Sequence, residues 1–193
     1  MRRLLPALLC VVVAAAVAAA VVAATGDKPE QPKSAAPPEK EAAASLAGAP
    51  APLAGLHDQS SRLLDGGPEA FEKRLAALKG YPVVVNMWGS WCEPCRAEFP
   101  YFQSQAIERG KEVAFVGVDG QDNDADASEF LREYPVAYPS YKDPDLKIAK
   151  VIKAVGPFPA TVFYDREGKI THLKQGGYPD ERALAQDIGR YAR

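Results

Sequence analysis

The chain has 193 residues, enough for one ordinary domain with additional segments, and 47 % of them are hydrophobic, as in a folded globular protein. Its 23 basic and 25 acidic side chains leave a formal net charge of −2, and Lys and Arg do not cluster in the body of the chain. Such a charge distribution gathers no nucleic acid, so we exclude that class of partner.

The N-terminal segment is a candidate membrane anchor. After Arg2 and Arg3, an uncharged stretch runs from Leu4 to Ala24. As a helix it is long enough to cross a hydrocarbon core of about 30 Å, and the two arginines would stay on the cytoplasmic side. A cleaved secretory signal peptide accounts for the same residues. Residues 1–24 are therefore interpreted as a single-pass anchor or a signal peptide, and both place the rest of the chain outside the cytoplasm.

Residues 25–52 differ in composition from the residues after them. They are rich in Ala, Pro, Glu and Lys and contain no aromatic residue, which is typical of a flexible linker. A coil of this length spans roughly 30 Å, enough to hold a domain clear of the lipid headgroups. The folded domain is then predicted over residues 53–193.

Within residues 53–193, hydrophobic periodicity and turn residues predict alternating helices and strands. The expected elements, in chain order, are helices over Leu53–Leu64 and Pro68–Leu78, a buried strand Pro82–Met87, a helix from Glu93 to about Glu108, a strand Val113–Val118, a solvated acidic loop Asp119–Asp126, a helix Ser128–Tyr134, a short strand Tyr138–Tyr141, a helix Asp145–Ala154, strands Ala160–Asp165 and Lys169–Gln175, and a helix Pro179–Tyr191. The sum is an α/β domain with a terminal hairpin and helix.

The segment WGSWCEPCRAEFP, Trp88 to Pro100, places two cysteines where a buried strand ends and a helix begins. Free N–H groups and the positive dipole end at a helix N-terminus stabilise a thiolate, which predicts Cys92 as the nucleophile. Cys95 lies one turn further on the same face and is predicted as the resolving thiol. Pro94, in the first turn, needs no N–H to donate and stiffens the backbone between the two sulfurs.

A structural zinc site is the alternative chemistry for a C-x-x-C sequence. Tetrahedral zinc needs four ligands, and the only other cysteine, Cys10, stands in the N-terminal apolar stretch. His57 and His172 do not have ligand-like spacing to the pair. We therefore expect neither a metal nor another cofactor.

These motifs resemble the thioredoxin superfamily and, within it, the membrane-anchored TlpA/ResA/DsbE-like branch, whose members carry out thiol-disulfide exchange outside the cytoplasm. The likeness runs from about Tyr81 to the C-terminus. It rests on the strand followed by WCEPC, on a β-α-β-type insert, and on the block GPFPATVFYDREGK with its D-x-x-G-K turn. It implies a thioredoxin fold, a central mixed sheet flanked by helices, in which the helical segment Leu53–Leu78 replaces the first strand.

The resemblance also implies roles for the residues around the second motif. Pro159 would be the cis-proline that faces the active-site disulfide, and Phe158 would expose its backbone to the substrate chain. The cis form of an X-Pro bond costs only about 0.5–1 kcal/mol relative to the trans form, and proline presents no N–H beside the reactive sulfurs. An ordinary trans loop proline is the alternative.

The acid–base group is the point at which this sequence departs from thioredoxins. Where they carry a buried aspartate, six residues before the first cysteine, this chain has Asn86, which takes no proton. Glu98 matches the glutamate of the CEPCxxEFP pattern in the ResA-like members, where it manages the active-site proton. The alternative is a solvated helix glutamate. Glu93 is assigned to tuning the potential and substrate preference, and Trp91, on the turn, to shielding the cysteines and meeting the substrate.

The predicted function is an extracytoplasmic thiol-disulfide oxidoreductase that reduces disulfides of exported proteins. The resemblance points to cytochrome c maturation or to general disulfide reduction, with a membrane electron donor or acceptor for the cysteine pair and a monomeric protein. A disulfide-forming role is the first alternative, because C-E-P-C does not determine the reduction potential. A redox-inert binding module or metallochaperone on the same fold is the second.

Overall fold

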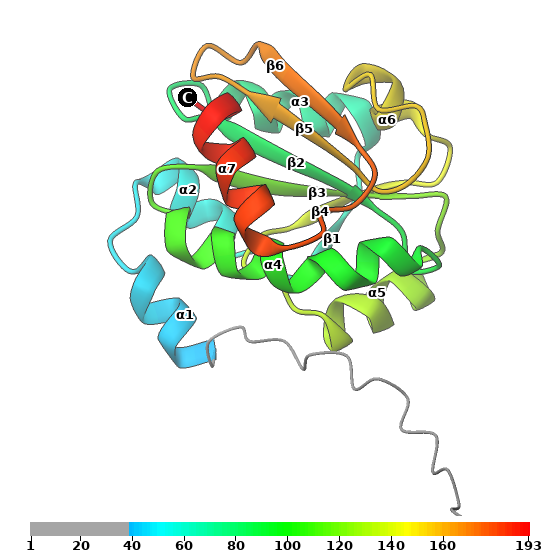
Figure 1. Cartoon of the computed structure of the whole chain (residues 1–193), viewed down its shortest axis with the longest axis horizontal. Helices are drawn as coiled ribbons and strands as arrows, with labels where there is room; N and C mark the ends of the chain where they lie inside the picture. Colours follow the sequence, from blue (N-terminus) through cyan, green and yellow to red (C-terminus); the bar gives the residue numbers. More distant parts are fainter. Residues whose placement is uncertain (1–38) are drawn as a thin grey trace, which may run out of the picture. The chain divides into compact units, whose positions relative to one another are not determined.

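The computed structural model describes residues 39–193, and these form one α/β unit (Figure 1). The strands are β1 (Leu63–Leu64), β2 (Val83–Trp88), β3 (Ala114–Gly120), β4 (Ser140–Asp143), β5 (Ala160–Tyr164) and β6 (Ile170–Gln175). The helices are α1 (Glu39–Leu46), α2 (Ala51–His57), α3 (Gly67–Ala77), α4 (Glu93–Arg109), α5 (Asp124–Glu133), α6 (Lys147–Val151) and α7 (Glu181–Tyr191). Among the described residues no helix is long and apolar enough to cross a membrane. The segment predicted as an anchor or signal peptide, 1–24, lies outside them.

The six strands form a single mixed sheet in the order β1-β4-β3-β2-β5-β6. The first four strands in this order run parallel, and β5 and β6 are antiparallel to their neighbours. The central strand β2 is buried along its whole length, which explains why it reads as a continuous apolar run. This topology confirms the predicted thioredoxin fold. It places the C-terminal end of β2 between the ends of its neighbours β3 and β5.

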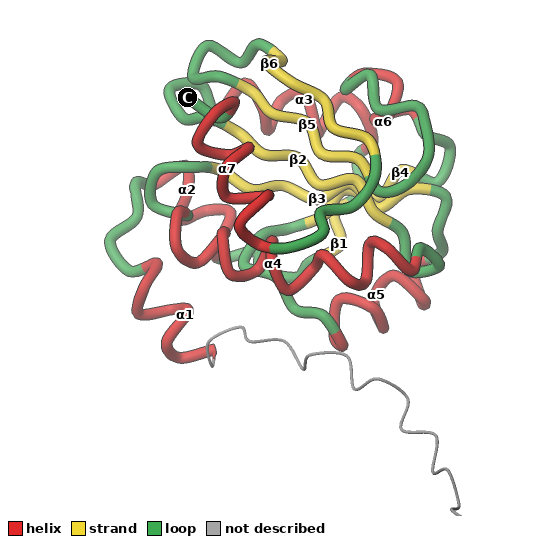
Figure 2. Tube along the Cα trace, viewed as in Figure 1, coloured by secondary structure: helices red, strands yellow, loops and turns green. Residues whose placement is uncertain are grey.

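Helices cover both faces of the sheet (Figures 1 and 2). Alternate residues of β2 point to opposite faces, so Val84 and Trp88 pack with α4, α5 and α7, whereas Val83 and Met87 pack with α2, α3 and α6. The first core also receives the buried side of α1. We call the side covered by α4 the α4 face, because the reactive groups lie on it.

The structure differs from the sequence-based expectation before residue 65, whereas the next predicted helix, Pro68–Leu78, is found as α3. Helix α1 lies inside the segment predicted as a flexible linker, and its Ala42 and Leu46 are buried against the core of the α4 face. The segment predicted as a helix up to Leu64 ends at His57, and Leu63–Leu64 pair with β4 as a short parallel edge strand. The first strand is therefore present and not replaced by helix. Backbone pairing with β4 overrides a helical spacing of leucines that no local signal contradicted.

Candidate active site

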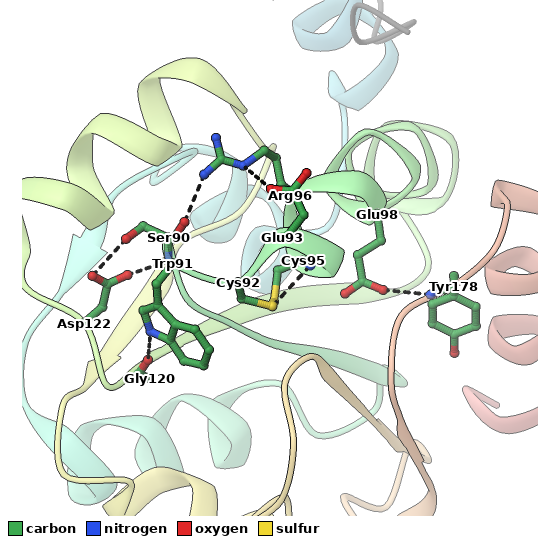
Figure 3. Close-up of a disulfide and its surroundings, with 10 residues drawn as sticks. All are labelled: Ser90, Trp91, Cys92, Glu93, Cys95, Arg96, Glu98, Gly120, Asp122 and Tyr178. Carbon is green, nitrogen blue, oxygen red and sulfur yellow. Dashed lines mark hydrogen bonds and ion pairs between the residues drawn. A yellow bond between two sulfur atoms is a disulfide. The ribbon is translucent and has the colours of Figure 1, made fainter. Parts of the chain in front are cut away.

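The two cysteines lie at the N-terminus of α4, directly after the turn that follows β2 (Figure 3). Cys92 is the N-cap residue, and its Sγ accepts a hydrogen bond from the Cys95 backbone N–H at 3.2 Å. The two residues form a disulfide with their Cα atoms 5.3 Å apart. Cys95 is fully enclosed and Cys92 slightly less so. Cys92 is thus the less buried residue of the pair, and its role as the nucleophile stays a prediction.

The turn before Cys92 is fastened at Ser90 from two sides (Figure 3). The Ser90 backbone N–H and hydroxyl donate to the two carboxylate oxygens of Asp122, at 2.5 Å and 3.0 Å. The Arg96 guanidinium donates to the Ser90 carbonyl at 3.0 Å. All three polar groups of Ser90 are thus engaged, so the backbone that leads into Cys92 has little freedom.

Arg96 brings a positive charge to the helix end that carries the disulfide. Its guanidinium lies 5.5 Å from the ring centres of Phe130 and Tyr134 and 3.7 Å from the Glu93 carboxylate. Arg96 also lies 3.8 Å from the Glu133 carboxylate, so its side chain joins the first turn of α4 to α5. Sequence reasoning did not single out Arg96, Ser90 or Asp122, because Asp122 reaches Ser90 only through the loop after β3 and Arg96 packs on rings from α5.

Trp91 and Phe158 form an aromatic border beside the disulfide. Trp91 is 54 % exposed, its ring centre lies 4.9 Å from that of Phe158, and its indole N–H donates to the Gly120 carbonyl at 3.3 Å. A Cβ at Gly120 would lie 2.7 Å from Phe158 Cζ, so glycine there allows Phe158 to pack against the end of β3. The exposed indole is available to a bound chain, as expected for Trp91.

Pro159 follows a cis peptide bond after Phe158, as expected. Its carbonyl accepts a hydrogen bond from the Gly176 N–H at 2.8 Å, which joins the start of β5 to the loop after β6. Gly176 has a φ of +81°, a conformation that glycine adopts without strain. A Cβ built at the neighbouring Gly177 would lie 3.7 Å from both Pro159 Cγ and Glu98 Oε2. The Gly176–Tyr178 segment therefore lies between the proline and the glutamate.

Glu98 is fully buried, on the same side of α4 as Cys95 (Figure 3). Its Oε2 accepts a hydrogen bond from the Tyr178 backbone N–H at 3.0 Å, and Oε1 lacks a partner among the described residues. Burial raises the pKa of Glu98 to about 8, although the Tyr178 N–H and the Lys174 charge both act to lower it. A carboxyl in this state exchanges a proton near neutral pH. The alternative of a solvated Glu98 is wrong.

Further buried polar groups lie on the α4 face. The Asn86 amide, the Tyr138 hydroxyl and the Thr161 hydroxyl lack hydrogen-bond partners among the described residues. Asn86 and Thr161 stand opposite each other on β2 and β5. Burial raises the pKa of Tyr138 well above its usual range, and the Glu98 charge raises it further, so Tyr138 stays protonated. Tyr138 therefore does not exchange a proton near neutral pH, whereas Glu98 does.

The prediction of a solvated loop over Asp119–Asp126 is wrong at Asp119. It belongs to β3, faces Trp88 in the sheet register and is 3 % exposed. Burial and then the nearby Asp122 and Asp124 charges raise the pKa of Asp119 to about 8. Only residues 121–123 remain as a loop, and Asn123 caps α5 by accepting from the N–H groups of the first turn. Continued strand pairing with β4 draws the carboxyl inside.

Two of the other predicted site residues, Glu93 and Pro94, are exposed in the first turn of α4. The structure thus brings Trp91, Cys92, Cys95, Phe158 and Pro159 together at one edge of the sheet, with Glu98 beneath them. In the described part of the chain, no group of three or more His, Cys, Asp and Glu side chains is placed to hold a metal ion.

The chain is similar in sequence and structure to known thiol-disulfide oxidoreductases. The chain is 34 % identical over 112 residues to the thiol-disulfide oxidoreductase ResA of Oceanobacillus iheyensis, covering 56 % of this chain and 57 % of the relative. It therefore spans little more than half the length of that relative. Among solved structures it is similar to a protein of Chlorobium tepidum described as a thiol:disulfide interchange protein DsbE, with 32 % identity, a TM-score of 0.54, and coverage of 60 % of this chain and 83 % of the other.

A second similar structure is that of a secreted Mycobacterium tuberculosis disulfide oxidoreductase homologous to DsbE, with 26 % identity, a TM-score of 0.54, and coverage of 60 % of this chain and 85 % of the other. The sequence profile of the AhpC/TSA family matches residues 47–173, a range that contains both cysteines, Glu98 and Pro159. The expected resemblance to ResA-like and DsbE-like proteins is confirmed, and with a thioredoxin-type sheet and a cysteine pair at the start of α4, the chain belongs to the AhpC/TSA family.

Proposed function

We propose that this protein is a thiol-disulfide oxidoreductase that reduces disulfides of exported proteins. The observation that carries the proposal is the Cys92–Cys95 disulfide at the N-terminus of α4 with the buried Glu98 carboxyl one turn further along the helix. The similar proteins named ResA and DsbE support the same reaction class. Exchange needs a thiolate, a second thiol and a proton acceptor, and the site offers one residue for each.

In the proposed reaction, the Cys92 thiolate attacks one sulfur of a substrate disulfide. That S–S bond breaks, a mixed disulfide forms, and the departing substrate sulfur takes a proton. The carboxylate form of Glu98, the minor form at neutral pH because its pKa is about 8, accepts the Cys95 proton. The Cys95 thiolate then attacks Cys92 Sγ, the mixed disulfide breaks, and the second substrate sulfur leaves and takes the proton from Glu98. The products are the Cys92–Cys95 disulfide and a substrate with both thiols reduced. Two electrons have moved from the protein to the substrate.

Trapping of the mixed disulfide tests the roles of the two cysteines. A Cys95→Ser variant lacks the resolving thiol, so it should accumulate covalent adducts with disulfide-containing proteins that reducing agents release. A Cys92→Ser variant should accumulate none. Adducts on Cys92→Ser alone would reverse the roles, and adducts on neither variant would leave a redox-inert module as the better interpretation.

The reduction potential of the purified chain tests the direction of electron flow. Equilibration in thiol redox buffers should place the Cys92–Cys95 couple near or below about −220 mV, which makes the protein a reductant. A value above about −150 mV would make it a disulfide-forming oxidant and reverse the proposed direction.

We further propose that the domain works outside the cytoplasm and that a membrane electron donor re-reduces the pair, in cytochrome c maturation or in general disulfide reduction. The uncharged stretch from Leu4 to Ala24 after Arg2 and Arg3 supports export, as does the similarity to a secreted relative. A reporter enzyme that is active only outside the cytoplasm, fused after residue 193, should be active, and deletion of 4–24 should abolish that activity. Activity without 4–24 would contradict the proposal.

A further inference from the structure

The loop between β6 and α7 connects the two halves of the active site. At one end the Gly176 N–H donates to the Pro159 carbonyl at 2.8 Å, and at the other the Tyr178 N–H donates to Glu98 Oε2 at 3.0 Å. The Tyr178 bond is the only hydrogen bond that Glu98 receives among the described residues. The position of this loop therefore decides how the Glu98 carboxyl is held.

One side chain holds the carbonyls of this loop. Lys174 Nζ donates to the carbonyls of Gly176 at 2.7 Å and Gly177 at 3.0 Å, and it lies 4.6 Å from the centre of the Tyr178 ring. Lys174 pairs with Thr161, and Thr161 pairs with Asn86, which lies on the α4 face of β2. The lysine therefore projects toward the same side as Glu98. The ammonium also donates to the Gln175 carbonyl at 3.5 Å, so three carbonyls and one ring anchor it beside the loop.

We propose that Lys174 is a positioning residue for Glu98: it holds the Gly176–Tyr178 loop so that the Tyr178 N–H stays on the carboxyl. The proposal deepens the proposed function, because Glu98 is the group assigned there to accept the Cys95 proton. Without Lys174, Glu98 would lose a nearby cation and part of the support for its one donor, and it would hold its proton more tightly.

The other groups that face Glu98 do not replace Lys174. The Tyr138 hydroxyl lies on the same face, and burial raises its pKa, so it contributes no charge near neutrality. Burial likewise raises the pKa of Tyr178, whose hydroxyl donates to the Asp187 carboxylate of α7 at 3.1 Å. Cys95 of α4 is engaged in the disulfide. In the oxidised protein, Lys174 is therefore the cation that acts on Glu98 among the described residues.

The test is a titration of Glu98 itself in the full chain, oxidised and labelled with 13C at the glutamate carboxyls. The Glu98 signal is assigned by its loss in Glu98→Gln. We expect a midpoint near 8 in the unchanged chain. Lys174→Met should move it upward by about half a pH unit or more, whereas Lys174→Arg, which keeps the charge, should titrate close to the unchanged chain.

The matched control is Lys169→Met, which removes the same charge from an exposed position just before β6 and should leave the midpoint in place. An unmoved midpoint in Lys174→Met, or equal shifts in the two methionine variants, would overturn the proposal. This readout does not depend on enzymatic activity. A chain that fails to exchange disulfides but shows the Lys174 shift would refute the proposed function alone.

Discussion

Two carboxyl groups that belong to different parts of the site have pKa values far above the ordinary range. The pKa of Glu98 is about 8 because the residue is buried with a single hydrogen-bond donor. The pKa of Asp119 is about 8, chiefly because the carboxyl is buried. Repulsion from the Asp122 and Asp124 carboxylates also raises this pKa, and the Lys142 charge lowers it. Both groups are protonated at neutral pH in the folded protein and ionised in the unfolded chain, so both make stability fall as pH rises from about 4 to 8.

Glu98→Gln should remove the Glu98 part of this pH dependence. Between pH 4.5 and about 8 the folded state of the unchanged chain holds a proton that the unfolded state has lost. Glutamine does not titrate, so the free energy of unfolding of the variant should rise relative to that of the unchanged chain across this window, by on the order of a few kcal/mol. Denaturant unfolding at several pH values measures it.

The controls for this experiment are Asp119→Asn, which should remove a separate part of the dependence in the same window, and Asp58→Asn, an exposed carboxyl whose loss should leave the profile unchanged. A Glu98→Gln profile parallel to that of the unchanged chain would show that the folded state does not hold the Glu98 proton above pH 4.5.

At the scale of elements, the turn between β2 and α4 depends on the loop after β3. Asp122→Ala removes both acceptors that Ser90 uses and leaves a half-buried N–H without a partner. We expect the free energy of unfolding to fall by about 1–3 kcal/mol and the Ser90 amide to exchange its hydrogen faster. Hydrogen exchange measured by NMR checks the second effect at that residue.

Asp126→Ala is the comparison for Asp122→Ala, because Asp126 contacts Asn123 and not the turn. Faster Ser90 exchange in both variants would mean that α5 as a whole, rather than the Asp122 carboxylate, restrains the turn.

Helix α1 tests where the folded domain begins. Leu46 is buried in the core of the α4 face, whereas Glu41 on the same helix is exposed. Leu46→Ala should lower the free energy of unfolding by about 2 kcal/mol, since it removes buried methyl groups at a site near the edge of the core. Glu41→Ala should change it by less than about 0.5 kcal/mol. Equal, negligible effects in thermal or denaturant unfolding would place α1 outside the cooperative domain.

At the scale of the whole molecule, the described residues contain both hydrophobic cores and all six strands of the sheet. A chain that begins at residue 39 should therefore fold by itself and unfold in one cooperative transition, with coincident far-UV and near-UV circular dichroism curves. A chain that begins at residue 48 lacks α1 and should melt at a lower temperature. Two separate transitions in the longer chain would contradict a single domain.

Much of the fold could be predicted because it depends on local patterns. Strands such as Val83–Trp88 and Ala114–Gly120 are largely apolar, helices such as α4 and α7 carry a periodic buried side, and Gly and Pro separate them. The helix predicted over Pro68–Leu78 is found as α3, but the elements before residue 65 were predicted less well, because Leu63–Leu64 become a strand only by pairing with β4. The packing of α1 likewise depends on a core that lies far away in the sequence.

For the site, the sequence alone determined the position of the cysteine pair, since a strand, a turn and a helix start are local features, and the resemblance added Glu98 and Pro159 to it. Only the tertiary structure decided that Glu98 is buried, that its donor is Tyr178, 80 residues away, and that Lys174, Asp122 and Asp119 surround the site. The physical reason is that burial and hydrogen bonding, which set a pKa and hold a turn, are properties of the groups that the folded chain places around a residue and not of its neighbours in sequence.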